Sequence, residues 1–273
     1  MPELPEVETV CRYLREGRPE QPPVVGRTIR NVEINWERSV AYPDADTFRR
    51  RIIGQKISQI GRRGKYLILK LNPDTLLVHL RMSGDLYVHQ LHMPDGPHDR
   101  VVFQLDQDQK LVFEDSRKFG RIWLVDNPAE VVGNLGPEPL GEEFTPASLY
   151  ALLQSRHRQL KPLLLDQSFI AGLGNIYTDE ALHIARLHPL TLSDALRPED
   201  AERLWAAIRQ ALQAAIRRNG TSIDWIYRGG DYQKYLRVYQ RTGDPCPNCG
   251  TPIERIVVGQ RGTHICPACQ KLL

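Results

Sequence analysis

The sequence predicts a multidomain α+β protein with three parts: an N-terminal helix packed on an antiparallel β-sandwich, a helical domain, and a C-terminal β-hairpin module that binds metal. Three observations support this prediction. Short strand-like segments separated by turns lie between Arg27 and Val125, helical patterns extend from Pro146 to Arg218, and two Cys-x-x-Cys pairs stand near the end. With 273 residues, of which 41% are hydrophobic, the chain is long enough to bury two cores.

The first element expected is a helix that faces a core. Val7, Val10, Cys11 and Leu14 recur at i, i+3, i+4 and i+7, and the pattern ends near Gly17. Cys11 lies on the apolar face, so we expect it to be a small core residue.

The residues before this helix carry unusual chemistry. Removal of Met1 would leave Pro2 with a free secondary amine, and an α-amino group titrates near pH ~8, well below the ~10.4 of lysine. Glu3 is a carboxyl that could protonate a leaving oxygen beside this nucleophile. The alternative is that Pro2 and Pro5 only lead into the helix, with acids suited to its dipole. The two interpretations are compatible.

A sandwich or barrel is expected next. One short helix is predicted at 46–53, and strands are predicted at 29–34, 65–71, 76–80, 86–89, 100–105, 111–114 and 121–125. The stretch 61–65 (Gly-Arg-Arg-Gly-Lys) is expected to be a turn before a strand, where it could approach a phosphate or simply be solvated.

The second half is expected to be helical. A stretch rich in Pro and Gly at 127–143 is interpreted as an interdomain hinge. Helices are predicted at 146–154, 161–166, 175–184 and 198–218. We expect domain boundaries at 1–126, 127–143, 144–235 and 236–273.

The strongest motif is the pair of Cys-x-x-Cys segments, Cys246 with Cys249 and Cys266 with Cys269, separated by 16 residues. This spacing favours a structural four-thiolate zinc site, and a module this small would need the metal in order to fold. Redox dithiols or disulfides are the alternatives.

Charge and hydropathy give weaker indications. The net charge is only +3, but from Arg217 onward nine Lys or Arg residues face four Asp or Glu residues. Such a basic end suits a phosphate-facing surface or simple solubility. No leader-like opening or long apolar run is present, so we expect a cytoplasmic protein without a membrane partner.

Three stretches together resemble bacterial formamidopyrimidine-DNA glycosylases, which excise oxidised purines from DNA. These are the opening residues 2–9, the segment 167–180 with its Gly-rich entrance to a helix, and the four-cysteine motif. Segment 167–180 resembles the helix–two-turn–helix signature of that family. The resemblance covers both ends and the middle of the chain, and it implies a helix–two-turn–helix domain and a zinc finger.

The resemblance also implies catalytic roles. Pro2 matches the Schiff-base nucleophile, Glu3 the residue that protonates the sugar, Lys65 the catalytic lysine, and Arg261 an arginine that reaches the lesion phosphates. From the residues alone, Arg261 would be a solvated cation at the tip of a hairpin turn formed by residues 260–263.

Further positions match DNA contacts in the family. The residues that would fill the space left by the extruded base are Met82, Arg117 and Phe119, although a Met or Phe at a strand end is ordinarily a core residue. The remaining contacts implied are His98, Arg156, Lys161 and Asn175. Segment 220–224 matches a loop that closes over the damaged base.

The sequence is therefore identified as resembling a monomeric, bifunctional DNA glycosylase and AP lyase that acts on oxidised purines in duplex DNA. Two alternatives stay open. The related endonuclease VIII-like glycosylases prefer oxidised pyrimidines, whereas Leu4 and the Arg117-Lys118-Phe119 stretch resemble the purine branch. A zinc-containing DNA-binding protein without catalysis would need the basic end and the helices, but it has no need for a free Pro2 beside Glu3.

Overall fold

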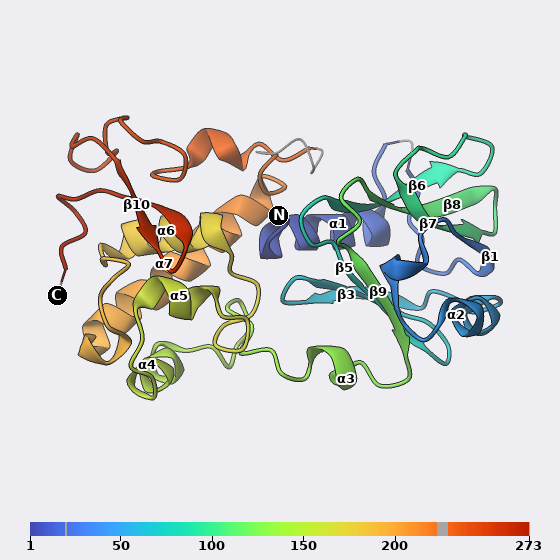
Figure 1. Ribbon diagram of the computed structural model, residues 1–273, viewed down its shortest axis with the longest axis horizontal. Helices are drawn as coiled ribbons and strands as arrows, with labels where there is room; N and C mark the ends of the chain where they lie inside the picture. The colour runs from blue at the N-terminus through green and yellow to red at the C-terminus, as the bar shows by residue number, and fades with distance from the viewer. Residues whose placement is uncertain (20, 223–228, 273) are drawn as a thin grey trace. The chain divides into compact units, whose positions relative to one another are not determined.

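The computed structural model describes residues 1–19, 21–222 and 229–272 (Figure 1). The chain divides into two compact units. Unit 1 comprises residues 1–134 with 219–230, and unit 2 comprises residues 135–218 with 231–273.

Unit 1 contains the two sheets of a sandwich. The first sheet has the order β1-β7-β8-β6, and the second has the order β2-β9-β5-β4-β3. The strands of the first sheet are β1 (Ile29–Ile34), β6 (Gly84–Gln90), β7 (Asp99–Leu105) and β8 (Gln109–Asp115). The strands of the second sheet are β2 (Val40–Tyr42), β3 (Gln59–Arg63), β4 (Tyr66–Lys70), β5 (Thr75–His79) and β9 (Arg121–Val125).

Helix α1 (Leu4–Glu16) contacts β3 and β4 of one sheet and β6 of the other. Its predicted apolar face is buried, and Val7, Val10, Cys11 and Leu14 belong to the core that runs through both sheets. Gly17 ends the helix, as predicted, with φ at 78°. Because the helix is held by a large apolar core, its first turn has a fixed position.

The structure corrects three expectations for unit 1. Residues 59–63 form strand β3, so the turn before β4 comprises only Gly64 and Lys65. The pairing of β2 with β9 is parallel, whereas an antiparallel sandwich was expected. A short helix, α3 (Ala129–Val132), interrupts the predicted hinge. The other helix of this unit is α2 (Ala45–Ile52), and a 3-10 turn, η1, spans Glu37–Ser39.

Unit 2 is helical, as predicted, with α4 (Pro146–Gln154), α5 (Leu160–Leu165), α6 (Asn175–Ala185) and α7 (Pro198–Arg217). The predicted stripe of α7 is buried, including Leu204, Ile208 and Leu212. Two 3-10 turns, η2 (Ser193–Ala195) and η3 (Tyr232–Tyr235), complete the elements before the last hairpin.

The chain ends in a hairpin of β10 (Glu254–Val258) and β11 (Arg261–Ile265), with β11 against α6. The expected hairpin turn at 260–263 is wrong by one to two residues. Val258 pairs with Arg261, and Gly259 and Gln260 between them both have positive φ, at 55° and 63°. A two-residue turn of this kind matches the twist of the strands, so Arg261 begins β11. Among the described residues, no helix is long and apolar enough to cross a membrane.

Candidate functional site

The amino terminus is held by the first turn of α1. Glu3 is the N-cap residue, and its backbone N–H donates to Oε2 of Glu6 at 2.9 Å. Pro2, Glu3 and Glu6 are all buried. The capping box therefore fixes the residue that follows Pro2.

Glu6 also reaches residues far along the chain. Its Oε1 accepts from the backbone N–H of Thr221 at 2.8 Å and from the Thr221 hydroxyl at 3.2 Å. A Cβ added at Gly220, where φ is 74°, would lie 2.5 Å from the same oxygen. From the sequence, Glu6 is expected only to be one of the acids suited to the helix dipole, although the spacing of Glu3 and Glu6 is that of a capping box. In segment 220–224, which was predicted to close over the damaged base, residues 223–224 lie outside the described residues.

Lys65 lies in the turn between β3 and β4 and is buried. Cys11 Sγ lies 3.0 Å from the carbonyl oxygen of Gly61, and Arg62 Nε donates to Glu8 Oε2 at 2.9 Å. The residue nearer the start of α1, Glu8, thus contacts the later residue of β3, Arg62, so the two elements run in opposite directions. The Gly64-Lys65 turn accordingly lies toward the amino-terminal end of α1, on the side of Pro2 and Glu3.

His79, at the end of β5, packs edge-on against the ring of Tyr66, with centroids 4.6 Å apart. Burial, together with the nearby cations of Arg81 and Lys65, lowers the pKa of His79 to about 3. Its Nδ1 accepts from the backbone N–H of Arg81 at 3.0 Å. The imidazole next to Lys65 is therefore neutral at physiological pH.

The turns that carry Met82 and Phe119 are joined through one buried carboxylate, that of Asp115. Its Oδ1 accepts from the Ser83 hydroxyl and, at 3.1 Å, from the backbone N–H of Arg117, and its Oδ2 accepts from Gly120 N–H at 2.7 Å. A side chain at Gly120 would clash with Phe113, since an added Cβ would lie 2.3 Å from the ring.

The two apolar residues predicted to fill the space left by the extruded base, called wedge residues below, are exposed on these turns. Met82 is 39% exposed and Phe119 is 47% exposed, whereas a core residue would be covered. The guanidinium of Arg117 lies 5.1 Å from the centroid of the Phe119 ring. The structure thus presents two apolar side chains and a cation together on a fixed base.

His98 belongs to the same cluster. Its carbonyl accepts from Asp115 N–H at 2.9 Å, and its Nδ1 lies 3.2 Å from Nη2 of Arg100, whose Nε donates to the Asp115 carbonyl at 2.7 Å. Asp115, which no sequence motif singles out, therefore brings together four predicted residues from three segments. Pairing between β6 and β8 creates this arrangement, and no local motif signals it.

In unit 2, two predicted residues meet at the carbonyl oxygen of Gly262, directly after Arg261. Asn175 Nδ2 and Lys161 Nζ each donate to it at 3.1 Å. Lys161 is 0% exposed, and its ammonium also pairs with Asp179 Oδ1 at 2.5 Å. The side chain of Lys161 is thus covered by protein, whereas Arg261 is exposed.

Arg156 lies apart from this group in its described contacts. It follows α4, is exposed, and donates to the carbonyl and hydroxyl oxygens of Ser155 at 3.1 and 3.3 Å.

The four cysteines of the last module have the geometry of a zinc site. Their sulfur atoms all lie within 4.8 Å of one another, and the Cys249–Cys266 and Cys246–Cys269 distances are 3.5 and 3.9 Å. Tetrahedral ligands at about 2.3 Å from zinc would be about 3.8 Å apart, so the cluster fits the ion. Hydrogen bonding with Thr251 lowers the pKa of Cys249 to about 6, whereas burial raises the pKa of Cys266 and of Cys269. The charge of the metal ion itself would therefore have to favour the thiolate forms of Cys266 and Cys269.

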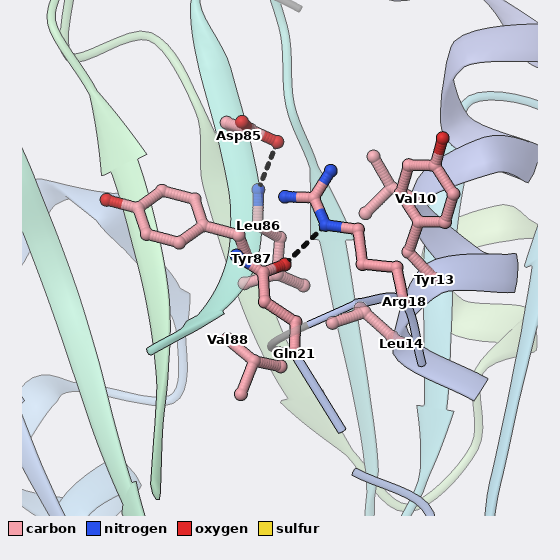
Figure 2. Close-up of a pocket in the computed structure, with 9 residues that line it drawn as sticks. All are labelled: Val10, Tyr13, Leu14, Arg18, Gln21, Asp85, Leu86, Tyr87 and Val88. Carbon is pink, nitrogen blue, oxygen red and sulfur yellow. Dashed lines mark hydrogen bonds between the residues drawn. The ribbon is translucent and has the colours of Figure 1, made fainter. Parts of the chain in front are cut away.

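Unit 1 also contains a pocket between α1 and β6 (Figure 2). Arg18 Nε donates to Gln21 Oε1 across it at 2.6 Å, and the Arg18 guanidinium lies 4.9 Å from the centroid of the Tyr13 ring. It lies along the carboxyl-terminal half of α1, and its described lining includes none of the predicted site residues.

The chain matches three family profiles: "Formamidopyrimidine-DNA glycosylase N-terminal domain" over residues 1–122, "Formamidopyrimidine-DNA glycosylase H2TH domain" over 135–226, and "Zinc finger found in FPG and IleRS" over 243–272. A formamidopyrimidine-DNA glycosylase of Symbiobacterium thermophilum is 48% identical over 99% of this chain and 89% of its own. One of Chloroflexus aurantiacus is 46% identical, over 99% and 98%.

Two solved structures are also similar. A MutM complex with DNA containing carbocyclic 8-oxo-G is 37% identical with a TM-score of 0.90, covering 99% of this chain and 100% of that one. The Lactococcus lactis FPG complex with FAPY-dG DNA gives 37% and 0.90, over 98% and 100%.

Proposed function

The chain belongs to the formamidopyrimidine-DNA glycosylase family, and from that premise we propose that it is a bifunctional glycosylase and AP lyase that removes oxidised purines from duplex DNA. The observation that carries the proposal is the position of Pro2 and Glu3. They adjoin at the start of a helix whose apolar face is anchored in the core of unit 1, and the capping box fixes Glu3.

The chemistry starts with removal of Met1, because only then is the Pro2 nitrogen a free amine. The amine attacks the sugar C1′ and displaces the base, which takes up a proton as it leaves, and the new ammonium nitrogen loses its own proton. Glu3 donates a proton to the ring oxygen, so the C1′–O bond breaks and the sugar opens to an iminium ion on Pro2. Elimination then breaks the C–O bonds to the 3′ and 5′ phosphates. Lys65 and Arg261 assist as cations, Lys65 from the turn near the start of α1.

DNA contacts come from both units. In unit 1, Met82 and Phe119 fill the gap left by the flipped base, with Arg117 and His98 beside them. In unit 2, Asn175 and Arg156 contact phosphates. The burial of Lys161 supports an indirect role, in which its bond to Gly262 holds the start of β11 and so positions Arg261.

Zinc bound to Cys246, Cys249, Cys266 and Cys269 supplies structure. Four thiolates fill a tetrahedral shell and leave no position for a reactive water. The protein acts as a monomer, and the reduced thiols that zinc requires favour the cytoplasm as its compartment.

Borohydride trapping tests the nucleophile. An iminium ion between Pro2 and C1′ is reduced by borohydride to a stable amine, so the protein should form a covalent complex with a duplex that contains 8-oxoguanine. Pro2→Leu, whose large second residue retains Met1, should form none. Normal trapping by this variant would refute the assignment.

Two further assays test the role of Glu3 and the class of lesion that the protein excises. Glu3→Gln should lose base excision more than cleavage at a pre-formed abasic site, because only base excision needs Glu3 to protonate the ring oxygen of the sugar. Excision of oxidised pyrimidines in preference to 8-oxoguanine would favour the endonuclease VIII-like alternative. Duplex binding without any trapping would favour the non-catalytic one.

A further inference from the structure

One face of α6 contacts the C-terminal zinc module (residues 236–273) at three points, and within this module strand β11 packs against α6. Figure 1 shows the hairpin that contains β10 at this end of the chain. Asn175, Asp179 and His183 are spaced at i, i+4 and i+8, so they lie on the same side of the helix. Asn175 donates to the carbonyl of Gly262, and Asp179 Oδ2 accepts from the backbone N–H of His264 at 2.9 Å. The third residue of this face, His183, reaches a metal ligand.

His183 Nε2 lies 3.3 Å from the sulfur of Cys246, within hydrogen-bonding distance for sulfur. Both residues are deeply buried, at 0% and 3% exposure. The same sulfur lies 3.4 Å from the backbone N–H of Asn248. The four sulfur atoms of Cys246, Cys249, Cys266 and Cys269 would fill a tetrahedral zinc shell, so the imidazole would contact a ligand and would not be a fifth ligand.

Burial makes this contact significant. An imidazole removed from water is costly unless its nitrogen atoms form hydrogen bonds. Among the described residues, His183 Nδ1 has no hydrogen-bond partner, so the contact with Cys246 is the polar interaction that offsets burial of the ring. A zinc-bound thiolate can only accept, and the proton therefore belongs on Nε2. A phenyl ring would fill the same space without donating.

We propose that His183 is a positioning residue of the zinc site: its Nε2–H donates to the thiolate of Cys246, strengthens retention of the metal, and links the metal to α6. Donation to the sulfur offsets part of the thiolate charge and fixes its orientation toward the ion. The proposal depends on the zinc site and is independent of the lesion that the enzyme excises.

Two substitutions in the full-length zinc protein separate donation from packing. His183→Phe keeps a planar ring and removes the donor, whereas His183→Gln keeps an N–H at a similar reach. Loss of a residue that bonds to a metal ligand lowers metal affinity roughly 10–100-fold, so His183→Phe should release zinc to a chromophoric chelator at correspondingly lower chelator concentration. His183→Gln should stay close to the parent.

Cobalt replacement supplies a spectroscopic measurement. The sulfur-to-cobalt charge-transfer band should shift in His183→Phe and not in His183→Gln, because only the former alters the charge on Cys246. His157→Phe is the control, since His157 is 72% exposed and pairs with Asp194. Unchanged zinc affinity and an unchanged band in His183→Phe would reduce His183 to a packing residue and overturn the proposal.

A measurement on the parent protein covers the case in which His183→Phe does not fold. With cadmium-113 in place of zinc, NMR should detect a slowly exchanging Nε2 proton on His183 that is coupled to the metal through sulfur. A His183 ring protonated at Nδ1 alone would exclude the proposed donor, whatever the variants do.

Discussion

The two ends of the chain hold their proposed site residues by different physical means. At the amino terminus, Glu3 is positioned by a helix whose apolar face joins a core that runs through both sheets of unit 1. At the carboxyl terminus, the buried cluster of the zinc module consists of Val238, Cys246, Ile253 and Cys266, and two of these four are metal ligands.

This difference predicts that folding of the two ends differs in its dependence on single polar or metal-binding groups. The hydrophobic effect stabilises unit 1 through many contacts, so no single polar group is needed for it to fold. The zinc module has too little apolar area to fold alone, and it depends on the metal and on polar contacts to α6. The proposed nucleophile, Pro2, thus precedes a helix that is anchored in a large apolar core, whereas the hairpin that carries Arg261 depends on bound metal for its fold.

The largest expected effect is loss of the zinc module. Cys249→Ser leaves three thiolates, which should abolish stable zinc binding, unfold the hairpin and displace Arg261. DNA binding should be lost while unit 1 stays folded, because unit 1 has its own core. Zinc content, circular dichroism and duplex affinity measure the three consequences.

Cys11→Ala is the matched control, because it removes a buried thiol from the core of unit 1. It should leave the zinc content unchanged and lower the free energy of unfolding by only about 1 kcal/mol. A metal-free Cys249→Ser protein that cleaves lesion DNA at the parent rate would remove the contrast between the two ends.

The next effect tests how far the robust end depends on one polar residue. Glu6→Gln retains one acceptor oxygen, so either Glu3 N–H or Thr221 N–H must face an amide donor. An unsatisfied buried donor costs about 1–3 kcal/mol, which should appear in chemical denaturation of unit 1 and as a slower excision step.

Glu8→Gln is the control for Glu6→Gln. Glu8 also lies in α1, but it is partly exposed and paired with Arg62, so its loss should cost less than about 1 kcal/mol. Equal destabilisation by both variants would mean that the hydrogen bonds of Glu6 stabilise unit 1 no more than a surface ion pair does.

The sequence predicted those features that depend on neighbours along the chain. Helices α1 and α7 follow from their apolar periodicity, and the zinc site follows from cysteine spacing. Strand β3 was missed because Gly61, Arg62 and Arg63 are typical of a turn, whereas their backbone pairs with β4 as an edge strand.

Contacts between distant residues were not predictable in this way. Asp115 connects its turns because β6 pairs with β8, and Glu6 meets Thr221 across 215 positions. His183 was read as one residue of a helix, since its distance from Cys246 depends on how the zinc module packs on α6.

A smaller effect concerns the pH dependence of unit 1. His79 has a folded pKa of about 3, below its unfolded value of about 6.5, so only the unfolded state takes up this proton between these values. Stability should fall as the pH drops below about 6.5, by about 2 kcal/mol at about pH 5.

His79→Asn should flatten this dependence, because asparagine keeps an acceptor for Arg81 N–H and does not titrate. Urea denaturation at several pH values measures it, and His92→Asn, at an exposed position, should keep the parent slope. A parent slope in His79→Asn would show that the imidazole is not held neutral.

The smallest expected effect concerns the two turns that carry Met82 and Phe119. The fold of unit 1 should persist when these exposed side chains are truncated. Met82→Ala and Phe119→Ala leave the Asp115 hydrogen bonds in place, so the turns keep their shape. Each should weaken binding to lesion duplex by about 1–2 kcal/mol, since filling the vacated stack offsets part of the unstacking cost, and binding to single strands should change less. Met93→Ala, which truncates another exposed methionine of unit 1, should have no effect on either.

Arg117→Ala should lower the slope of log affinity against log salt by about 0.9 if the guanidinium contacts one phosphate. Unchanged duplex affinity in all three variants at Met82, Phe119 and Arg117 would remove the wedge role and leave Asp115 as the organiser of an ordinary surface turn.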